Sequence, residues 1–371
     1  MLHAYVYVHD LRSSGVVRNA LTYAGRIAQD RPTTLVAGFG EGFFADELSR
    51  ASGYRHKLLG RRPGPAARFV AAQRLRRWLK RQPPGAVLSI GNMGHATPFL
   101  AGRGLPQFPR IYCISNEVAR SGGWRDRWRL AWMNALVHDS ARVVLVGRTI
   151  KQVPLFAEAM ARGKAVELPN GIDLDRARRL AAEPVPHPWL EDPEVPVAIG
   201  IGRLRPQKNF DLLIDAVGQA RAARRLRLII LGGGTAEERE RLQSCAAAAG
   251  LGADFLLAGE TDNVFAWLSR ASVFALPSRW EGSSLALLEA LAVGTPVVAS
   301  RRAGDAADVL DHGRYGLLVD GESADELADA LLRQCSADVV RPGDRSLAFD
   351  DNAGAYASLI AELDRAGAVT R

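Results

Sequence analysis

Short apolar runs that end at turns alternate with stretches that carry apolar residues at helical spacing along this chain of 371 residues. The short runs are typical of buried strands, and the stretches between them are typical of helices. The predicted strands cover residues 4–8, 34–37, 86–90, 110–114, 142–146, 197–201, 228–231, 255–258 and 273–277. The predicted helices cover residues 16–28, 67–80, 210–223, 284–293 and 324–334, and residues 349–360 form a further amphipathic segment. This alternation indicates an α/β fold.

Residues 278–300 form the most informative of these segments. A strand ends just before them, and apolar residues recur at helical spacing from Leu285 onwards. Ser283 or Ser284 can cap this helix, and Gly294 stands where a glycine commonly ends one. A helix that begins just past the carboxyl end of a parallel strand points free N–H groups into the crevice there. These groups and the helix dipole favour a bound phosphate.

Two carboxylates flank this phosphate position, with Glu281 in the loop before the helix and Glu289 within the helix. Because a phosphate is anionic, the partners of these carboxylates are hydroxyl groups. A ligand that carries a phosphate between hydroxyl-rich groups is a nucleoside diphosphate sugar. The alternative is a surface helix whose two glutamates are solvated.

A second candidate phosphate contact follows the strand at residues 197–201, where Gly202, Arg203 and Lys208 precede the next helix. A glycine lets the backbone approach a ligand closely. Two cations can neutralise a diphosphate whose negative charge grows as the bond to the sugar breaks. We expect Arg205 to be a solvated surface charge.

Two segments resemble a known family. Glu281-x7-Glu289, within SRWEGSSLALLEALAVGTPVVAS, resembles the E-x7-E signature of the family-4 retaining glycosyltransferases, and residues 202–209, GRLRPQKN, resemble that family's GRL…KN segment. The resemblance implies the GT-B architecture, in which two Rossmann-like doubly wound domains face a central cleft. It also implies transfer of a hexose-type sugar, most commonly from a UDP-sugar, to a glycan or lipid-linked acceptor in bacterial cell-surface polysaccharide or lipopolysaccharide synthesis.

The resemblance implies a role for individual residues. The implied catalytic set is Glu281, Arg203 and Lys208, and the implied donor-binding set is Gly15, Gly202, Asn263, Gly282, Ser283, Ser284, Leu285 and Glu289. The cations and the amides that begin the helix would hold the diphosphate, while Glu281 would bind hydroxyls of the sugar and Glu289 those of the ribose. Retention by same-face attack, with the leaving phosphate taking the acceptor proton, requires no protein nucleophile, cofactor or metal.

Acceptor contacts are expected in the first half, where the resemblance is looser. The loop before the first helix has Ser14 and Gly15 where the family usually has two glycines, and a simple turn is the alternative. His95, at the carboxyl end of a strand, is a candidate acceptor contact or base, with a structural role as the alternative. The family often has a His-Asn pair further on, but this chain has Ser115 before Asn116, so only the asparagine carries over.

The length predicts two domains. We expect an acceptor-binding Rossmann-like domain at residues 1–183, a proline-rich linker at 184–196 and a donor-binding Rossmann-like domain at 197–345. Residues 346–371 resemble the family's final helix, which packs back on the first domain.

Charge is distributed unevenly along the chain. Residues 1–180 carry 29 Lys and Arg against 12 Asp and Glu, whereas the remaining residues carry 19 against 28. Such asymmetry predicts that the first domain faces an anionic partner, whether membrane phospholipid, a phosphate-linked acceptor or nucleic acid. Of these we favour an anionic membrane surface, contacted through residues 50–81 and 120–132.

Three tryptophans, Trp124, Trp128 and Trp132, recur at helical spacing among arginines in the second of these segments. Indole rings beside cations suit a membrane interface. The alternative is a stripe of core residues. No apolar run approaches the ~18 residues of a spanning helix.

The remaining features narrow the function further. Three isolated cysteines, Cys113, Cys245 and Cys335, are expected to be buried thiols in a reducing cytoplasm. We therefore expect a cytoplasmic protein that is peripheral on the inner face of the cell membrane.

The pair Asp173 and Asp175 follows a turn and is expected in a solvated loop, not at a metal. The alternative functions are a nucleotide-sugar epimerase or hydrolase of the same architecture and a nucleic-acid-binding protein.

Overall fold

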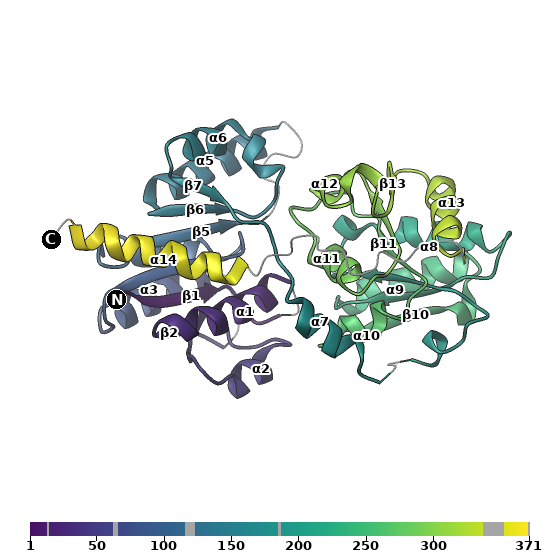
Figure 1. Cartoon of the computed structure of the whole chain (residues 1–371), viewed down its shortest axis with the longest axis horizontal. Coiled ribbons are helices and arrows are strands. Elements are labelled where there is room, and N and C mark those ends of the chain that lie inside the picture. Colours follow the sequence, from purple (N-terminus) through teal and green to yellow (C-terminus); the bar gives the residue numbers. More distant parts are fainter. Residues whose placement is uncertain (13–14, 62–65, 116–122, 185–186, 337–351, 370–371) are drawn as a thin grey trace. The chain divides into compact units, whose positions relative to one another are not determined.

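The computed structural model describes residues 1–12, 15–61, 66–115, 123–184, 187–336 and 352–369 of the chain (Figure 1). It divides into two compact units. Unit 1 is Met1–Pro169 with Asp351–Arg371, and unit 2 is Asn170–Asp350.

Unit 1 is built on a parallel sheet that has seven strands within the described residues, in the order β3-β2-β1-β4-β5-β6-β7. The strands are β1 His3–Val8, β2 Thr33–Ala37, β3 Arg55–Leu58, β4 Gly85–Ile90, β5 Arg110–Ile114, β6 Arg142–Leu145 and β7 Ala165–Glu167. The helices are α1 Gly15–Asp30, α2 Ala45–Arg50, α3 Ala67–Leu79, α4 Ala96–Gly102, α5 Trp124–Asp139, η1 Ile150–Gln152, α6 Pro154–Ala161 and α14 Asn352–Val369.

The strands of unit 1 are buried on both faces, as parallel sheets require. In β1, Val6 packs in the core under α1 and α14, whereas Tyr5 and Tyr7 pack in the core under α3 and α4. The last helix, α14, lies beside α1 (Figure 1). It also fastens the start of the chain, because the Asp364 carboxylate accepts from the Leu2 amide at 2.8 Å.

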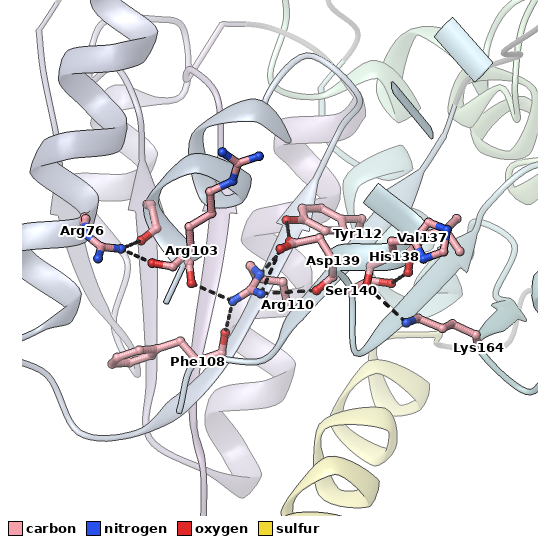
Figure 2. A network of polar contacts seen from close by, with 12 residues as sticks. Arg76, Arg103, Phe108, Arg110, Tyr112, Val137, His138, Asp139, Ser140 and Lys164 are labelled. Carbon is pink, nitrogen blue, oxygen red and sulfur yellow. Dashed lines mark hydrogen bonds and ion pairs between the residues drawn. The ribbon is translucent and has the colours of Figure 1, made fainter. Parts of the chain in front are cut away.

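A polar network holds the amino edge of this sheet together (Figure 2). The Arg110 guanidinium at the start of β5 donates to Asp139 at 2.7 Å and to the Phe108 carbonyl at 3.0 Å. The Tyr112 hydroxyl donates to the same carboxylate at 2.6 Å, and burial raises the pKa of Tyr112 far above its usual value. Asp139 ends α5, so the network ties this helix to β5.

Unit 2 has a parallel sheet of six strands within the described residues, in the order β10-β9-β8-β11-β12-β13. The strands are β8 Val197–Ile201, β9 Arg227–Leu231, β10 Phe255–Gly259, β11 Val273–Leu276, β12 Val297–Ser300 and β13 Leu317–Val319. The helices are α7 Leu174–Ala181, η2 Pro188–Leu190, η3 Pro206–Lys208, α8 Phe210–Ala220, α9 Ala236–Ala248, η4 Gly252–Asp254, α10 Val264–Leu268, α11 Leu285–Ala292, α12 Ala306–Val309, η5 Asp311–Gly313 and α13 Ala324–Gln334.

Unit 2 begins earlier in the chain than the prolines suggested. Helix α7 lies in residues that we expected in the first domain, but its Ala177 is fully buried in the same core as Val264 and Leu268 of α10. Asp173 and Asp175 are exposed, as expected, but they begin a helix where a loop was predicted. Asp173 caps α7 by accepting from the Arg176 amide at 2.8 Å, so Asp175 lies in the first turn of the helix.

Each sheet reverses its direction of winding at one place. In unit 2 the chain runs from β8 outwards through β9 and β10, and then from β11 outwards on the other side. In unit 1 the corresponding pair is β1 and β4. Ligands of doubly wound sheets bind outside the carboxyl ends of the two strands at such a reversal. In unit 2 this position lies where β8 and β11 end, at residues 202–208 and 278–284.

Candidate active site

The loop after β8 is shaped by glycines that leave room for a lysine. Gly202 has a φ of +154°, and a Cβ there would lie 2.5 Å from Cε of Lys208. Gly232, after β9, has a φ of +143°, and a Cβ there would lie 1.9 Å from the Gly202 carbonyl oxygen. A side chain at either position would collide with a neighbour, so the two loops touch through bare backbone and the Lys208 stem lies across Gly202.

Lys208 and Glu281, which the sequence separates by 73 residues, meet at the carboxyl ends of β8 and β11. The Lys208 ammonium lies 2.6 Å from Oε1 of Glu281, and Glu281 is only 7% exposed. A buried carboxylate is stable only when it is neutralised and hydrogen-bonded, and this pair meets the first condition.

Two further side chains donate to the Glu281 carboxylate. The buried Ser278 hydroxyl donates to Oε1 at 2.9 Å, and the Gln207 amide donates to Oε2 at 3.3 Å and to the Trp280 carbonyl at 2.9 Å. Sequence reasoning missed both residues. Their positions carried a signal, because both lie within segments that resemble the family, with Gln207 next to Lys208 and Ser278 three residues before Glu281.

The amino end of α11 faces the same loops. Ser284 precedes the helix and is 5% exposed, and its buried hydroxyl has no hydrogen-bond partner within the described residues. The preceding loop is packed against Gly304, where a Cβ would lie 2.4 Å from the Gly282 carbonyl oxygen. The Ser283 carbonyl accepts from the Asn170 side chain at 3.1 Å. Gly304 and Asn170 therefore fix the position of this loop. No side chain of the N-cap residue Ser284 caps the start of α11.

The other residues expected at the donor differ in exposure. Glu289 lies in α11 and is 3% exposed, whereas Arg203 is exposed directly after β8. Arg205, expected to be a surface charge, is exposed and pairs with Glu238 at 3.2 Å. Leu285 is the first residue of α11, and Gly15 is the first residue of α1. Ser14 lies outside the described residues.

Asn263 has a structural role in this protein. Its side-chain oxygen accepts from the Ala266 amide at 3.2 Å, which caps α10. Its side-chain amide donates to the Leu180 carbonyl at 2.9 Å and to the Glu183 carboxylate at 2.7 Å. Because both ends of the side chain join α7 to α10, we do not assign this side chain to the donor.

The expectation that His95 contacts the acceptor or acts as a base is wrong. The ring is fully buried, with Nδ1 2.8 Å from the Ser89 hydroxyl and Nε2 3.2 Å from the Cys113 carbonyl. Burial lowers the pKa of His95 to about 4, so the ring is neutral and its two nitrogens are occupied in joining β4 to β5.

The second acceptor candidate, Asn116, lies outside the described residues. Its neighbour Ser115 stands where the family has the histidine, and the Ser115 backbone amide donates to the side-chain oxygen of Asn92 at 3.0 Å. This contact places the start of the loop after β5 beside the loop after β4.

The tryptophans of α5 divide between surface and core. Trp124 and Trp128 are 68% and 72% exposed, and the guanidinium of Arg125 lies 5.5 Å from the Trp124 ring. Trp132 instead packs edge-on against Phe99 of α4, at 5.0 Å between ring centroids. The core-stripe alternative therefore holds for Trp132 and fails for the first two.

The described residues contain neither a cluster of metal-ligating side chains nor a membrane-spanning helix. No three His, Cys, Asp or Glu side chains gather there as a metal site would require, and no helix there has the length and apolarity to span a membrane. The three cysteines are unpaired, and burial raises the pKa of Cys113 to about 12. Cys113 is buried as expected, whereas Cys245 and Cys335 are half-buried.

Solved structures of the GT-B fold superpose with this chain. The Anabaena protein HepE, solved in complex with UDP and glucose, superposes with a TM-score of 0.75 at 17% identity over 100% of this chain and 99% of its own. WaaG, a glycosyltransferase involved in lipopolysaccharide biosynthesis, superposes with a TM-score of 0.71 at 16% identity over 96% and 95%. The expected GT-B fold, with two Rossmann-like sheets, is confirmed.

Sequence relatives identify the family. The family described as "Glycosyl transferases group 1" matches residues 195–362. A GDP-mannose-dependent alpha-(1-6)-phosphatidylinositol monomannoside mannosyltransferase of Mycobacterium tuberculosis is 30% identical over 328 residues, 82% of this chain and 79% of that protein. A D-inositol 3-phosphate glycosyltransferase of Corynebacterium jeikeium is 37% identical over 139 residues, 35% of this chain and 33% of that protein. The chain belongs to the group 1 glycosyltransferases, and the expected sugar transfer from a nucleotide-sugar donor is confirmed.

Proposed function

We propose that this glycosyltransferase transfers mannose from GDP-mannose to an anionic, lipid-carried acceptor, with retention at the anomeric carbon and without a metal. The choice of GDP-mannose replaces our initial expectation of a UDP-sugar. It is supported by the relatives that are named as GDP-mannose-dependent and that align over most of this chain. The single observation that carries the proposal is the ion pair between Lys208, in the loop after β8, and Glu281, in the loop that leads into α11.

In this proposal the diphosphate of the donor lies against the start of α11. The amides of Gly282 to Leu285 donate to its oxygens, and the Ser284 hydroxyl, which has no partner within the described residues, supplies one more donor. Lys208 and Arg203 add positive charge where negative charge grows as the sugar leaves. Glu281 accepts from hydroxyls of the sugar, and Glu289 from those of the ribose.

Retention follows from attack on the face that the diphosphate leaves. The departing phosphate oxygen takes the proton of the acceptor hydroxyl, so the protein supplies neither a nucleophile nor a base. The occupied nitrogens of His95 agree with such a mechanism. The reaction then needs positive charge at the diphosphate, which Lys208, Arg203 and the helix dipole provide without a metal.

Exposed apolar side chains on unit 1 support the lipid-carried acceptor. Phe69, Val70, Met93, Trp124 and Trp128 are all exposed. They lie in the first turns of α3 and α5 and in the loop after β4, and each of these segments follows a strand at the carboxyl edge of the sheet. Arg68, Arg125 and Arg127 are exposed beside them in the sequence. Indoles with arginines suit an anionic membrane surface.

The donor is tested by calorimetric titration with GDP-mannose, GDP, UDP-glucose and UDP. We expect GDP-mannose to bind most tightly, and Arg203→Ala and Lys208→Gln to weaken it at least ~10-fold, since each removes a charged contact to the diphosphate. Arg205→Ala is the matched control and should bind as the wild type does, because Arg205 faces solvent and Glu238.

The outcomes separate the alternatives. Tighter binding of UDP-glucose would restore the UDP-sugar expectation, and equal affinity of all variants would refute the placement of the diphosphate. Turnover of GDP-mannose at full rate without any acceptor would instead indicate a hydrolase or an epimerase.

The stereochemistry is read from the anomeric proton of the product by NMR, and activity that survives chelation with EDTA is expected. An inverted product would contradict same-face attack. Loss of activity with EDTA, restored by a divalent ion, would contradict the metal-free mechanism.

The membrane surface is tested by sedimentation with vesicles. We expect binding to vesicles that contain phosphatidylinositol and not to purely phosphatidylcholine vesicles, and we expect salt to weaken it. Replacing Trp124 and Trp128 by alanine should abolish sedimentation without unfolding the protein, because both rings are exposed. Sedimentation that is unchanged in this double variant would remove the membrane from the proposal.

A further inference from the structure

The Glu281 carboxylate has more hydrogen-bond donors than its pairing with Lys208 requires. Lys208 and Ser278 share Oε1, at 2.6 Å and 2.9 Å, and Gln207 donates to Oε2 at 3.3 Å. Without the lysine, each carboxylate oxygen would still accept from one uncharged donor: Oε1 from Ser278 and Oε2 from Gln207. This surplus matters because Glu281 is almost fully buried, where an unsatisfied carboxylate is costly.

Lys208 has two partners under the proposed function, Glu281 before the donor arrives and the diphosphate afterwards. A diphosphate carries more charge than one carboxylate, so the ammonium turns toward it when it binds. The neutralising contact to Glu281 then weakens, and the two neutral donors, Gln207 and Ser278, remain on the carboxylate.

We propose that Gln207 and Ser278 are positioning residues that keep the Glu281 carboxylate hydrogen-bonded while Lys208 holds the diphosphate. This inference rests on the proposed function, since it needs a diphosphate at Lys208. The two donors lower the free energy of the donor complex more than that of the free protein. They also fix the carboxylate in one orientation, with its remaining acceptor positions available to hydroxyls of the sugar.

The backbone around these residues is suited to this role. The Gln207 side chain also binds the Trp280 carbonyl at 2.9 Å, and the Gln207 carbonyl accepts from the Arg279 amide at 2.9 Å. The Arg279 side chain in turn donates to Asn209 at 3.1 Å. The loops after β8 and β11 are thus joined independently of Lys208, so movement of the lysine need not move Glu281.

The test compares binding of GDP and GDP-mannose, measured by calorimetry, with the melting temperature of the donor-free protein. In the double variant Gln207→Ala, Ser278→Ala we expect affinity for GDP to fall about 10-fold or more, because the bound state loses two hydrogen bonds to a charged group. The melting temperature of the donor-free protein should fall only slightly, because Lys208 still neutralises Glu281 there. Ser278→Thr keeps the hydroxyl and should restore most of the affinity that Ser278→Ala loses.

A control and a second background make the test specific. Gln243→Ala, on the exposed surface of α9, should change neither readout. In a Glu281→Gln background the carboxylate charge is absent, so Gln207→Ala and Ser278→Ala should no longer weaken GDP binding.

The failures are distinguishable. A wild-type protein that binds no nucleotide would overturn the proposed function and this inference together. A wild type that binds GDP, with a double variant of equal affinity, would overturn the inference alone. A fall in melting temperature without a change in affinity, or the same loss of affinity in the Glu281→Gln background, would show that the two side chains only support the fold.

Discussion

Replacing Gly202 by alanine should disable donor binding while leaving the protein folded. The new Cβ would lie 2.5 Å from Cε, 2.9 Å from Cδ and 3.1 Å from Cγ of Lys208. Ordinary contact between carbon atoms is about 3.5–4.0 Å, so the lysine stem must move by roughly 1 Å or more. A displacement of this size would break the 2.6 Å hydrogen bond between Lys208 and Glu281.

The expected stability cost is modest because the colliding atoms belong to a flexible side chain. The collision with Lys208 and the backbone strain of alanine at a φ of +154° together should lower the free energy of unfolding by about 1–3 kcal/mol. The affinity for GDP should fall at least ~10-fold, because the ammonium no longer reaches its position.

Urea denaturation and calorimetric titration with GDP measure the two effects separately. The matched control is Gly250→Ala, since Gly250 has a φ of +70° with nothing within 4 Å of the added Cβ. This variant should lose a similar amount of stability through its backbone alone and bind GDP normally. If Gly202→Ala bound GDP as tightly as the wild type, the argument that this glycine exists to seat Lys208 would be refuted.

Three predictions concern the stability of the fold. Because the folded-state pKa of His95 is lowered to about 4, the unfolded chain binds the extra proton first as pH falls below about 6.5, so stability should decrease by roughly 3 kcal/mol from pH 6.5 to 4. A His95→Asn variant should lack this part of the slope in denaturation curves recorded across that range. Asp139→Ala leaves Arg110 and Tyr112 without their shared partner and should lower the free energy of unfolding, measured by urea denaturation, by about 2–4 kcal/mol. The control Glu158→Ala removes an exposed ion pair and should lower it by less than ~1 kcal/mol. Asn263→Ala removes the cap of α10 and the hydrogen bond from this side chain to α7, so it should lower the melting temperature and leave GDP binding unchanged. Loss of GDP binding without a lower melting temperature would instead place this side chain at the donor.

Some elements were not predictable from the apolar pattern. Strand β3, Arg55–Leu58, has the sequence RHKL and is exposed throughout, so it has no alternation that predicts a strand. It forms because the edge of the sheet offers unpaired backbone groups at β2. Its basic side chains also suit an edge strand, because charge there opposes association with other sheets.

Single histidines and asparagines in loops were the least predictable site residues. His95 and Asn263 both follow strands, as binding residues do, yet hydrogen bonds within their own units occupy both side chains. A loop position after a strand is shared by binding residues and by the residues that fasten the loop. Only the neighbours brought in by the fold distinguish these two roles.

The sequence by itself determined the buried strands, the helix that begins at Leu285 and the pair of segments in which Lys208 and Glu281 lie, because periodicity, caps and glycines act over a few neighbouring residues. Only the tertiary structure decided that β8 lies beside β11, and with it that these two side chains meet across 73 residues of chain. Strand order depends on the packing of both faces of a sheet, which no local pattern records. For the same reason Gln207 and Ser278 became visible as partners of Glu281 only once the two loops had been brought together.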